Sequence, residues 1–308
     1  MMLRRESAPG RLTLPALALA LLASTGSARA QAWVGSPGGL DVSLDYNLAV
    51  SDKVIGDGDV EFPDGGTTTH QITLGAEYTP IDKLAVGIAL PMAVLKYTGS
   101  DLYPHPGGGS YDDGDLHATL TDLRAGARYQ LLDGVVALSP HIGFTIPVAD
   151  YETIGNTVAG RHLKAAHLGL SVGKVFMEAL YVHLTYEFSL VEKYDRVADT
   201  AQYGQNRSDV GFTVGYQLMD GKLDLSLSTN GRITHDGVSF NDFATFTPDE
   251  VLYHDAVLKE EILLAGVGVG YRVSDTVSTT VAGRLFVAGN NTQNASVIAL
   301  GLTWSPEL

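Results

Sequence analysis

Alternation of apolar and polar residues with a period of two recurs along most of the chain. In residues 41–48, Val42, Leu44 and Tyr46 share one face, while aspartate, serine and asparagine occupy the other. Such alternation is typical of β-strands that have one face against an apolar phase. The pattern predicts twelve strands, at roughly 40–50, 69–79, 84–97, 116–130, 135–146, 165–176, 180–192, 208–218, 222–234, 256–272, 276–288 and 295–304.

The connections between these strands alternate in length. Short turns are expected at 80–83, 131–134, 177–179, 219–221 and 273–275. Long acidic loops are expected near 51–68, 98–115, 147–164, 193–207 and 235–255, with a shorter one at 289–294. Transmembrane barrels have short turns on one side and long loops on the other. The sequence therefore predicts an all-β fold, a closed antiparallel up-and-down transmembrane β-barrel of about 12 strands.

Aromatic residues support the membrane interpretation over a soluble β-sandwich, which also alternates because one sheet face is buried. Every strand that runs toward a short turn ends in an aromatic residue of outward parity. A bilayer interface favours such a girdle, whereas a sandwich has no reason to build one. The six expected girdle residues are Tyr78, Tyr129, Phe176, Tyr216, Tyr271 and Trp304.

Three local features refine the barrel prediction. The apolar parity flips between Leu116 and Leu123, which predicts a one-residue bulge near Thr121–Asp122. Parity does not flip at Pro140, so we expect a local kink there and not a strand end. Closure requires strand 295–304 to pair with strand 40–50.

The first thirty residues have the pattern of a secretory signal peptide. Arginines precede a short apolar run from Leu12 to Ala23, and Ala28-Arg29-Ala30 forms an A-x-A cleavage site. The run is too short to cross a membrane as a helix, which needs about 20 residues. We therefore assign 1–30 to a cleavable signal and 31–308 to an outer-membrane barrel.

Composition excludes several classes of chemistry. The chain has no cysteine, which excludes disulfides, thiolate metal sites and a cysteine nucleophile. Its formal charge is −15, and removing the four arginines and one glutamate of residues 1–30 makes it −18, so nucleic acid is not an expected partner. The expected partners are outer-membrane lipids, lipopolysaccharide and a small-molecule solute, with no cofactor and no metal.

Acidic clusters in two of the long loops carry oxygen ligands of the kind calcium prefers. Neither has the spacing of an EF-hand, so solvated loop tips are the favoured interpretation, with cations bridging to lipopolysaccharide as the alternative. The clusters are Asp57, Asp59, Glu61 and Asp64, and Asp112, Asp113 and Asp115.

Residues 116–150 resemble a known family. Thr121-Asp122-Leu123-Arg124-Ala125-Gly126-Ala127-Arg128-Tyr129-Gln130-Leu131-Leu132 is similar to the Gly-Asp…Lys/Arg-Tyr-x-Leu-Leu signature of the outer-membrane transporter-like barrels named for the meta-cleavage pathway of phenol degradation. Pro140 with Gly143, and Thr145 with Pro147, resemble that family's next strand, although Thr121 stands where the family has glycine. The resemblance implies an outer-membrane barrel that passes small molecules, aromatic or hydrophobic ones among them.

Inward parity assigns a set of charged and histidine side chains to the lumen. They could form a selectivity lining, or a network of ion pairs and hydrogen bonds that holds the wall together, which is the favoured interpretation. Glu77 and Arg128 illustrate the network, because only Ala85 and Gly87 separate them. The full set is Asp41, Asp45, Glu77, Asp122, Arg124, Arg128, His141, His167, His183, Glu187, Asp224, Arg232 and Arg284.

Glycine, at 35 residues, is also concentrated at inward positions, where it leaves room for water, a partner side chain or a passing solute. Against this, Leu264, Phe286 and Val297 point inward and narrow the lumen. The favoured function is a channel or transporter for diffusion of small molecules, and the alternative is a plugged structural or adhesive barrel. A surface lipid hydrolase is disfavoured, because the lumenal histidines lie inside the wall and not at a rim open to lipid.

Overall fold

The computed structural model describes residues 32–99, 112–198, 201–240, 242 and 253–306. Their long elements are all strands: β1 (Leu40–Ile55), β2 (Glu61–Ile81), β3 (Leu84–Tyr97), β4 (His117–Leu120), β5 (Asp122–Tyr129), β6 (Ala137–Pro147), β7 (Ala165–Phe176), β8 (Leu180–Val191), β11 (Arg207–Leu218), β12 (Leu223–Thr234), β13 (Glu261–Arg272), β14 (Val277–Asn290) and β16 (Ser296–Trp304). The short elements are η2 (Asp57–Asp59), β9 (Tyr194–Ala198), β10 (Ala201–Tyr203), α2 (His254–Val257) and β15 (Thr292–Gln293).

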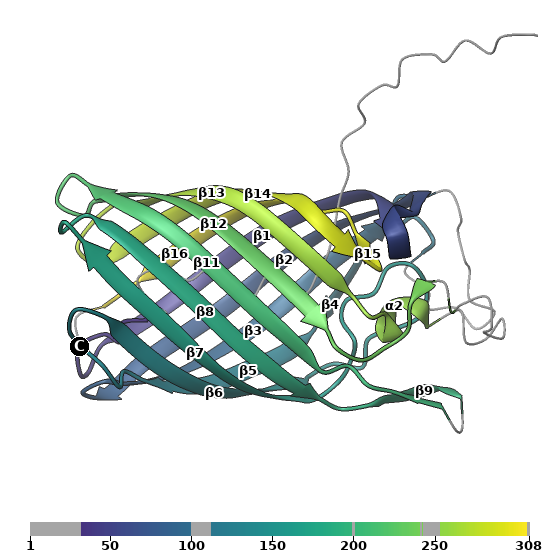
Figure 1. The fold of residues 1–308 in the computed structure, drawn as a ribbon, viewed down its shortest axis with the longest axis horizontal. Helices are drawn as coiled ribbons and strands as arrows, with labels where there is room; N and C mark the ends of the chain where they lie inside the picture. The colour runs from purple at the N-terminus through teal and green to yellow at the C-terminus, as the bar shows by residue number, and fades with distance from the viewer. Residues whose placement is uncertain (1–31, 100–111, 199–200, 241, 243–252, 307–308) are drawn as a thin grey trace, which may run out of the picture.

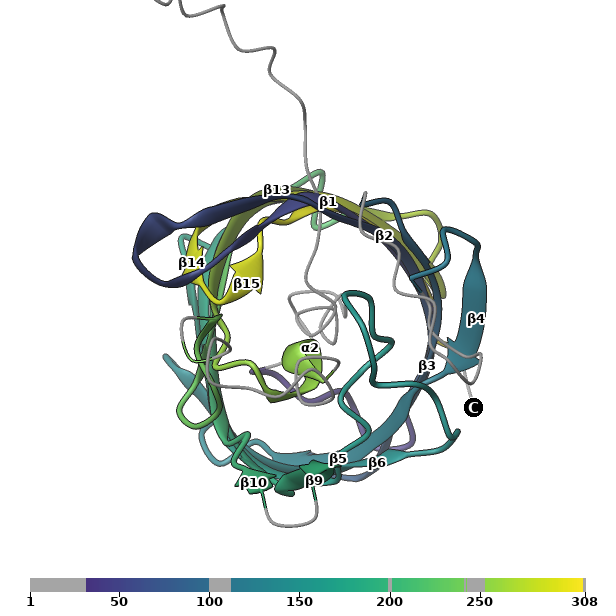
Figure 2. The ribbon, with the colours of Figure 1, turned by 90° about the vertical axis from the view of Figure 1, so that its right-hand side faces the viewer.

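The strands close into one antiparallel barrel, seen from the side in Figure 1 and along its axis in Figure 2. β1 pairs with β2 on one edge and with β16 on the other, in a register that runs from Val42–Trp304 to Val50–Ser296. β4 and β5 together make one barrel strand, so the described residues form a twelve-stranded barrel. The predicted fold, strand count and closure are confirmed.

The predicted bulge lies between β4 and β5. Leu120 faces Met92 of β3 and Arg124 faces Ala89, so three residues of one strand oppose two of the other. The amide of Thr121 donates to the carbonyl of Pro91 at 3.0 Å. In an antiparallel strand the N–H and C=O of one residue point toward the same neighbouring strand. The N–H that Pro91 lacks would therefore also point toward the bulge, where the hydrogen-bond ladder is already interrupted. The one-residue bulge is therefore confirmed.

Pro140 lies inside β6, which continues on both sides of it. It is opposite Leu170 of β7, while the pairing of β6 with β5 reaches only to His141. The N–H that Pro140 lacks is thus absent from a position where β5 no longer pairs with β6. As expected, the strand does not end at Pro140.

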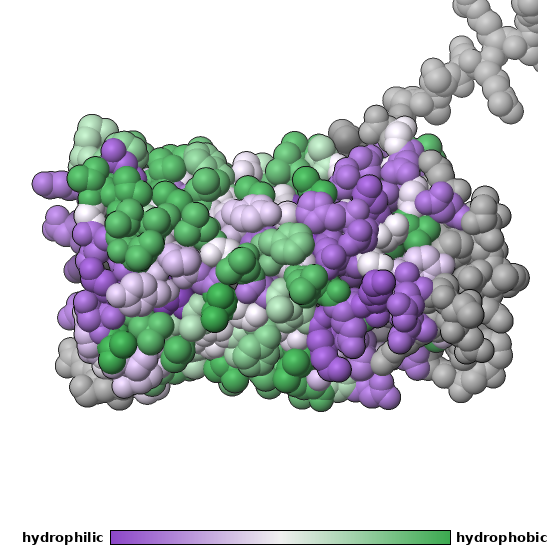
Figure 3. Space-filling view, turned by 60° about the horizontal axis from the view of Figure 1, so that its bottom comes forward, coloured by the Kyte–Doolittle hydropathy of each residue, from purple (hydrophilic) through white to green (hydrophobic). Residues whose placement is uncertain are grey.

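The outer wall carries large apolar side chains. Leu74, Ile142, Leu168 and Leu227 are each more than half exposed. Figure 3 shows hydrophobic residues over the barrel wall and hydrophilic residues gathered toward the end with the long loops. Soluble proteins rarely expose so continuous an apolar surface to water, whereas a barrel surrounded by lipid hydrocarbon needs one. No helix in the described part of the chain is long and apolar enough to span a membrane.

The six aromatic residues at the descending strand ends are all exposed on the outer wall, with exposed fractions from 37% for Phe176 to 51% for Trp304. They lie beside the short turns: Tyr78 is opposite Leu40 at the start of β1, and Tyr216 is opposite Leu180 at the start of β8. Their place fits a girdle at a membrane interface, and that role remains a prediction.

A cysteine pair tests the seam between β1 and β16. Leu44 and Leu302 are directly opposite and both exposed, and Cα atoms in such a pair are about 4.5–5.5 Å apart, within disulfide range. Since the native chain lacks cysteine, Leu44→Cys with Leu302→Cys should oxidise during export, leaving no thiol for maleimide labelling. Leu44→Cys with Ile298→Cys is the control, because about 13 Å then separates the residues along the strand. Equal oxidation of both pairs would contradict this register.

Candidate functional site

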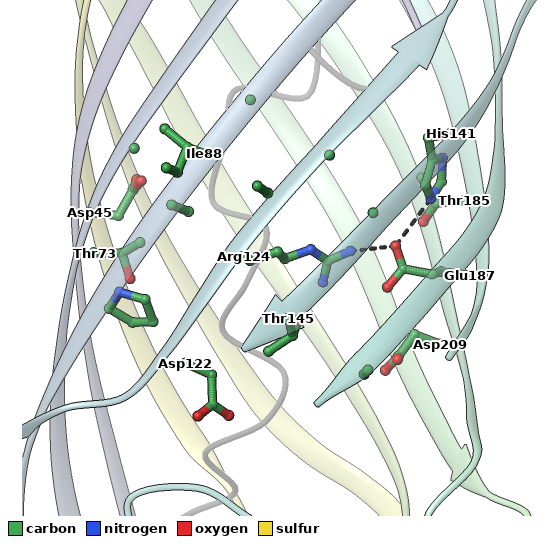
Figure 4. A pocket seen from close by; sticks show the side chains of 18 of the residues that line it. Asp45, Thr73, Ile88, Asp122, Arg124, His141, Thr145, Thr185, Glu187 and Asp209 are labelled. Atoms are coloured by element: carbon green, nitrogen blue, oxygen red, sulfur yellow. Dashed lines mark hydrogen bonds and ion pairs between the residues drawn. The ribbon is translucent and has the colours of Figure 1, made fainter. Parts of the chain in front are cut away.

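The central charged group of the lumen joins four neighbouring strands. Arg124 of β5 donates to Glu187 of β8, and the ring Nε2 of His141 lies 3.2 Å from the same carboxylate oxygen. The other oxygen of Glu187 lies 3.4 Å from Nδ1 of His167. Figure 4 shows Arg124 and His141 reaching the same oxygen of Glu187, Arg124 from the left and His141 from above. One carboxylate therefore ties β5, β6, β7 and β8 together on the lumenal face.

Glycines beneath these side chains make such lateral contacts possible. A Cβ at Gly169 would overlap the His141 ring, and a Cβ at Gly211 would come within 2.5 Å of the Thr185 hydroxyl. A Cβ at Gly215 would overlap the ring of Tyr181. At these positions the space freed by glycine is filled by a side chain from the neighbouring strand, which lies flat on the wall.

A second ion pair lies toward the short turns. Arg128 donates to Glu77 at 2.5 Å, although the two residues are on β5 and β2. The intervening strand β3 offers only Ala85 opposite Arg128 and Gly87 opposite Glu77, so nothing blocks the contact.

A third group lies toward the long loops and includes residues that the sequence analysis missed. Nε of Arg232 donates to Asp209 at 2.7 Å, and Nε of Arg207 lies 3.8 Å from the other Asp209 oxygen. Arg161, from the loop after β6, donates to Gln205 and lies 3.7 Å from Glu260. Asp209 is two residues from the inward Gly211, so strand parity could have assigned it to the lumen. Arg207 lies just outside the predicted strand, so parity did not assign it.

The remaining predicted lumenal residues are dispersed. Asp122 accepts a hydrogen bond from the Tyr151 hydroxyl at 2.5 Å, and Asp224 accepts one from Tyr181 at 2.9 Å. Arg284 packs against Gly266. Asp45 lies beside Gly301, and neither it nor Arg284 has an ion pair with another residue that the structure describes.

An apolar cluster occupies the opposite side of the barrel interior. Leu264 and Val297 are almost fully buried, and Phe286 packs against them. Ala49, Ile262 and Ala295 complete this cluster. These inward residues narrow the lumen on the side of β13, β14 and β16.

The start of the described chain, residues 32–34, lies inside the barrel at the short-turn end, which the strand pattern did not predict. The Ser139 hydroxyl donates to the carbonyl of Ala32 at 2.7 Å, and the amide of Val34 donates to Gln130 at 2.9 Å. The ring of Trp33 covers the inward Gly173, and its centroid is 6.4 Å from that of His183. The segment therefore narrows the lumen from this end.

The loop between β6 and β7 folds inward at the other end. Tyr151 and Ala159 pack against Ala93 and Leu95 of β3, and α2 lies within the barrel outline in Figure 2. Ala256 and Val257 of α2 pack with Leu163 of the inward loop. Since inward parity reports only on strands, it could not place either segment.

Between these two ends lies a lumenal cavity of about 550 Å³. It is lined by residues of β1, β2, β3, β5, β6, β7, β8, β11 and β12 and of the loop after β6. Asp45 and Thr73 are on one side, and Arg124, Glu187 and Asp209 are on the other (Figure 4). The arrangement is a cavity lined by both charged and small or apolar residues, inside a barrel whose outer wall is apolar.

The acidic loop residues mostly bind the protein itself. Asp57 accepts hydrogen bonds from Ser239 and Asn291, and Asp112 accepts one from the amide of Asn156 at 2.6 Å. The hydrogen bond with His117 lowers the pKa of Asp113. The side chains of Asp59 and Asp64 lie outside the described set, and within that set no three potential ligands are close enough to hold a metal ion.

One lumenal group contains the atoms of a hydrolytic triad. His167 lies 2.9 Å from the Ser189 hydroxyl, 2.7 Å from that of Thr145 and 3.4 Å from Glu187. However, Ser189 and the His167 side chain are completely buried. A nucleophile must be open to its substrate, so this arrangement crosslinks β6, β7 and β8.

Comparisons with solved structures define the class of fold. The chain is similar to an outer membrane channel from Pseudomonas putida F1, with a TM-score of 0.70 and 14% identity over 89% of this chain and 97% of that one. It is also similar to the β domain of the Bordetella autotransporter BrkA, with a TM-score of 0.51 and 13% identity over 87% and 100%. No protein-family model matches the sequence, and neither does any curated protein. The chain has the fold of outer-membrane β-barrels.

Two glycine variants test the role of the flat-lying side chains. Gly215→Ala forces the Tyr181 ring away from Asp224, and overpacking of this kind costs about 1–3 kcal/mol. Gly283→Ala is the matched control, because nothing lies within 4 Å of a Cβ there. Urea unfolding in lipid vesicles should show a lower midpoint for Gly215→Ala alone. Equal midpoints would mean that the ring has free space.

Proposed function

We propose that the chain is an outer-membrane channel through which small molecules diffuse. The observation that carries the proposal is a cavity of about 550 Å³, lined by charged and small residues, inside a closed barrel with an apolar exterior. A barrel of twelve strands can be filled by its own side chains, yet here several of the residues facing the cavity from β1, β2 and β3 are small, among them Ser43, Gly75 and Gly87.

Residues 1–30, which lie outside the described residues, are proposed to be the cleavable export signal. The small solutes would include aromatic or hydrophobic molecules, as the resemblance of residues 116–150 to the barrels named for phenol meta-cleavage implies. Lipopolysaccharide would surround the end with the long loops.

A plugged structural barrel is the second candidate, and the two inward segments favour it. Residues 32–34 and the loop holding Tyr151 and Ala159 occupy opposite ends of the lumen. A channel therefore needs each of them to move aside or to leave a water-filled passage. An enzymatic function is not proposed, because the serine–histidine–glutamate group of Ser189, His167 and Glu187 is sealed in the wall.

Planar-bilayer recording separates the two candidates. Purified barrel should produce discrete conductance steps, and it should discriminate weakly between cations and anions, because the cavity lining mixes both signs. Liposome swelling in neutral solutes gives an independent measure of passage. Silent membranes and no swelling, despite folded protein on a gel, would support the plugged barrel.

Shortening the Trp33 side chain tests the contribution of the N-terminal segment. Trp33→Ala removes the ring that covers Gly173, and we expect a severalfold rise in single-channel conductance because the passage widens at its short-turn end. Trp304→Ala is the control, since that ring lies on the outer wall. An unchanged current in Trp33→Ala would place the limiting constriction elsewhere.

A further inference from the structure

Four arginines lie close to one another in the lumenal cavity: Arg124 belongs to the central charged group, and the other three lie beyond it at the outer end, toward the long loops. Arg124, Arg161, Arg207 and Arg232 all line the cavity, and they come from β5, the inward loop, β11 and β12. Arg207 feels the positive charges of the other three as well as the negative charge of Asp209. So many guanidinium groups in one place need anions to offset their mutual repulsion.

The protein supplies these anions unevenly. Glu187 forms an ion pair with Arg124, and Glu260 forms one with Arg161. Asp209 is the nearest carboxylate to two arginines: Nε of Arg232 lies 2.7 Å from one of its oxygens, and Nε of Arg207 lies 3.8 Å from the other. The remaining carboxylate on this part of the lining, Asp122, is hydrogen-bonded by Tyr151.

Arg207 is therefore the least satisfied cation of the group. Its Nε is buried without a hydrogen-bond partner, and no shorter contact with a carboxylate compensates. A guanidinium offers a planar fork of donors that fits a carboxylate with two parallel hydrogen bonds. An incoming carboxylate would complete the coordination of Arg207 and the charge balance of the group.

An apolar surface adjoins this cation. Leu163, Ala165 and Val191 line the same cavity and belong to the cluster on which α2 packs. Val191 ends β8, two residues beyond Ser189, which is paired with Arg207. A charged group and an apolar surface next to it form a site for an amphiphilic solute.

We propose that the outer end of the lumen binds the carboxylate of a small organic acid on Arg207, with the apolar body of the acid against Leu163, Ala165 and Val191. This inference rests on the proposed function, since it names the class of solute for the same lumen. It makes Arg207 a specificity-determining residue of the channel.

Three probes with one ring and different charges test the site: benzoate, benzyl alcohol and benzylamine. Calorimetric titration of the purified barrel in an uncharged detergent should show the tightest binding for benzoate. Arg207→Gln should weaken benzoate binding about tenfold, because a charge-assisted hydrogen bond is lost, and should leave benzyl alcohol unchanged. Arg207→Lys should recover part of the benzoate affinity.

Arg272→Gln is the matched control, because it removes one arginine from the short-turn end of β13 without touching the cavity lining. Its benzoate affinity should stay within twofold of the parent, and heat-dependent gel mobility should show that every variant is folded. Equal benzoate binding by Arg207→Gln and parent, equal affinity for the three probes, or no benzoate binding would overturn the proposal.

The titration does not depend on conduction, so it separates this inference from the proposed function. A barrel that conducts but does not discriminate for benzoate would refute the site alone. A barrel that binds benzoate through Arg207 but never conducts would refute the channel alone.

Discussion

Backbone hydrogen bonding in a medium without water is the constraint on which this structure depends. Each unpaired N–H or C=O in hydrocarbon costs several kcal/mol, so a sheet can span a bilayer only when its two edges meet. Here β1 meets β16 through nine consecutive residue pairs. Closure then fixes the remaining features: one face of every strand must suit lipid, and the other faces a lumen of limited width.

Much of the fold could be predicted because strand parity is local information. A period of two in the sequence assigns each residue to lipid or lumen without knowledge of distant strands. The bulge was visible for the same reason, since an extra residue at Thr121 reverses the parity that Leu123 would otherwise have. The closeness of Glu77 and Arg128 was also accessible, because the expected order of strands leaves only small residues between them.

The rest could not be predicted because it depends on how distant strands slide past one another. Parity places Arg124 and Glu187 in the lumen, but only the register across β6 and β7 shows that they touch. Arg161 lies outside any strand, so no periodicity reports its direction. The N-terminal segment gave no signal either, since Trp33 is a lone aromatic in a stretch without alternation.

The N-terminal segment also bears on the order in which the molecule is built. Ala32 is bound by Ser139, which is 107 residues away, and residues 32–39 lead directly into β1, whose outer edge closes the barrel with the last strand. Contacts so distant in sequence are slow to form, because long loops must close first. Residues 32–34 lie inside the barrel, and the chain then continues into β1, the strand that closes the barrel. The simplest order of assembly encloses these residues while β1 and β16 are still unpaired. Filling of the interior and sealing of the wall would then be a single event in assembly.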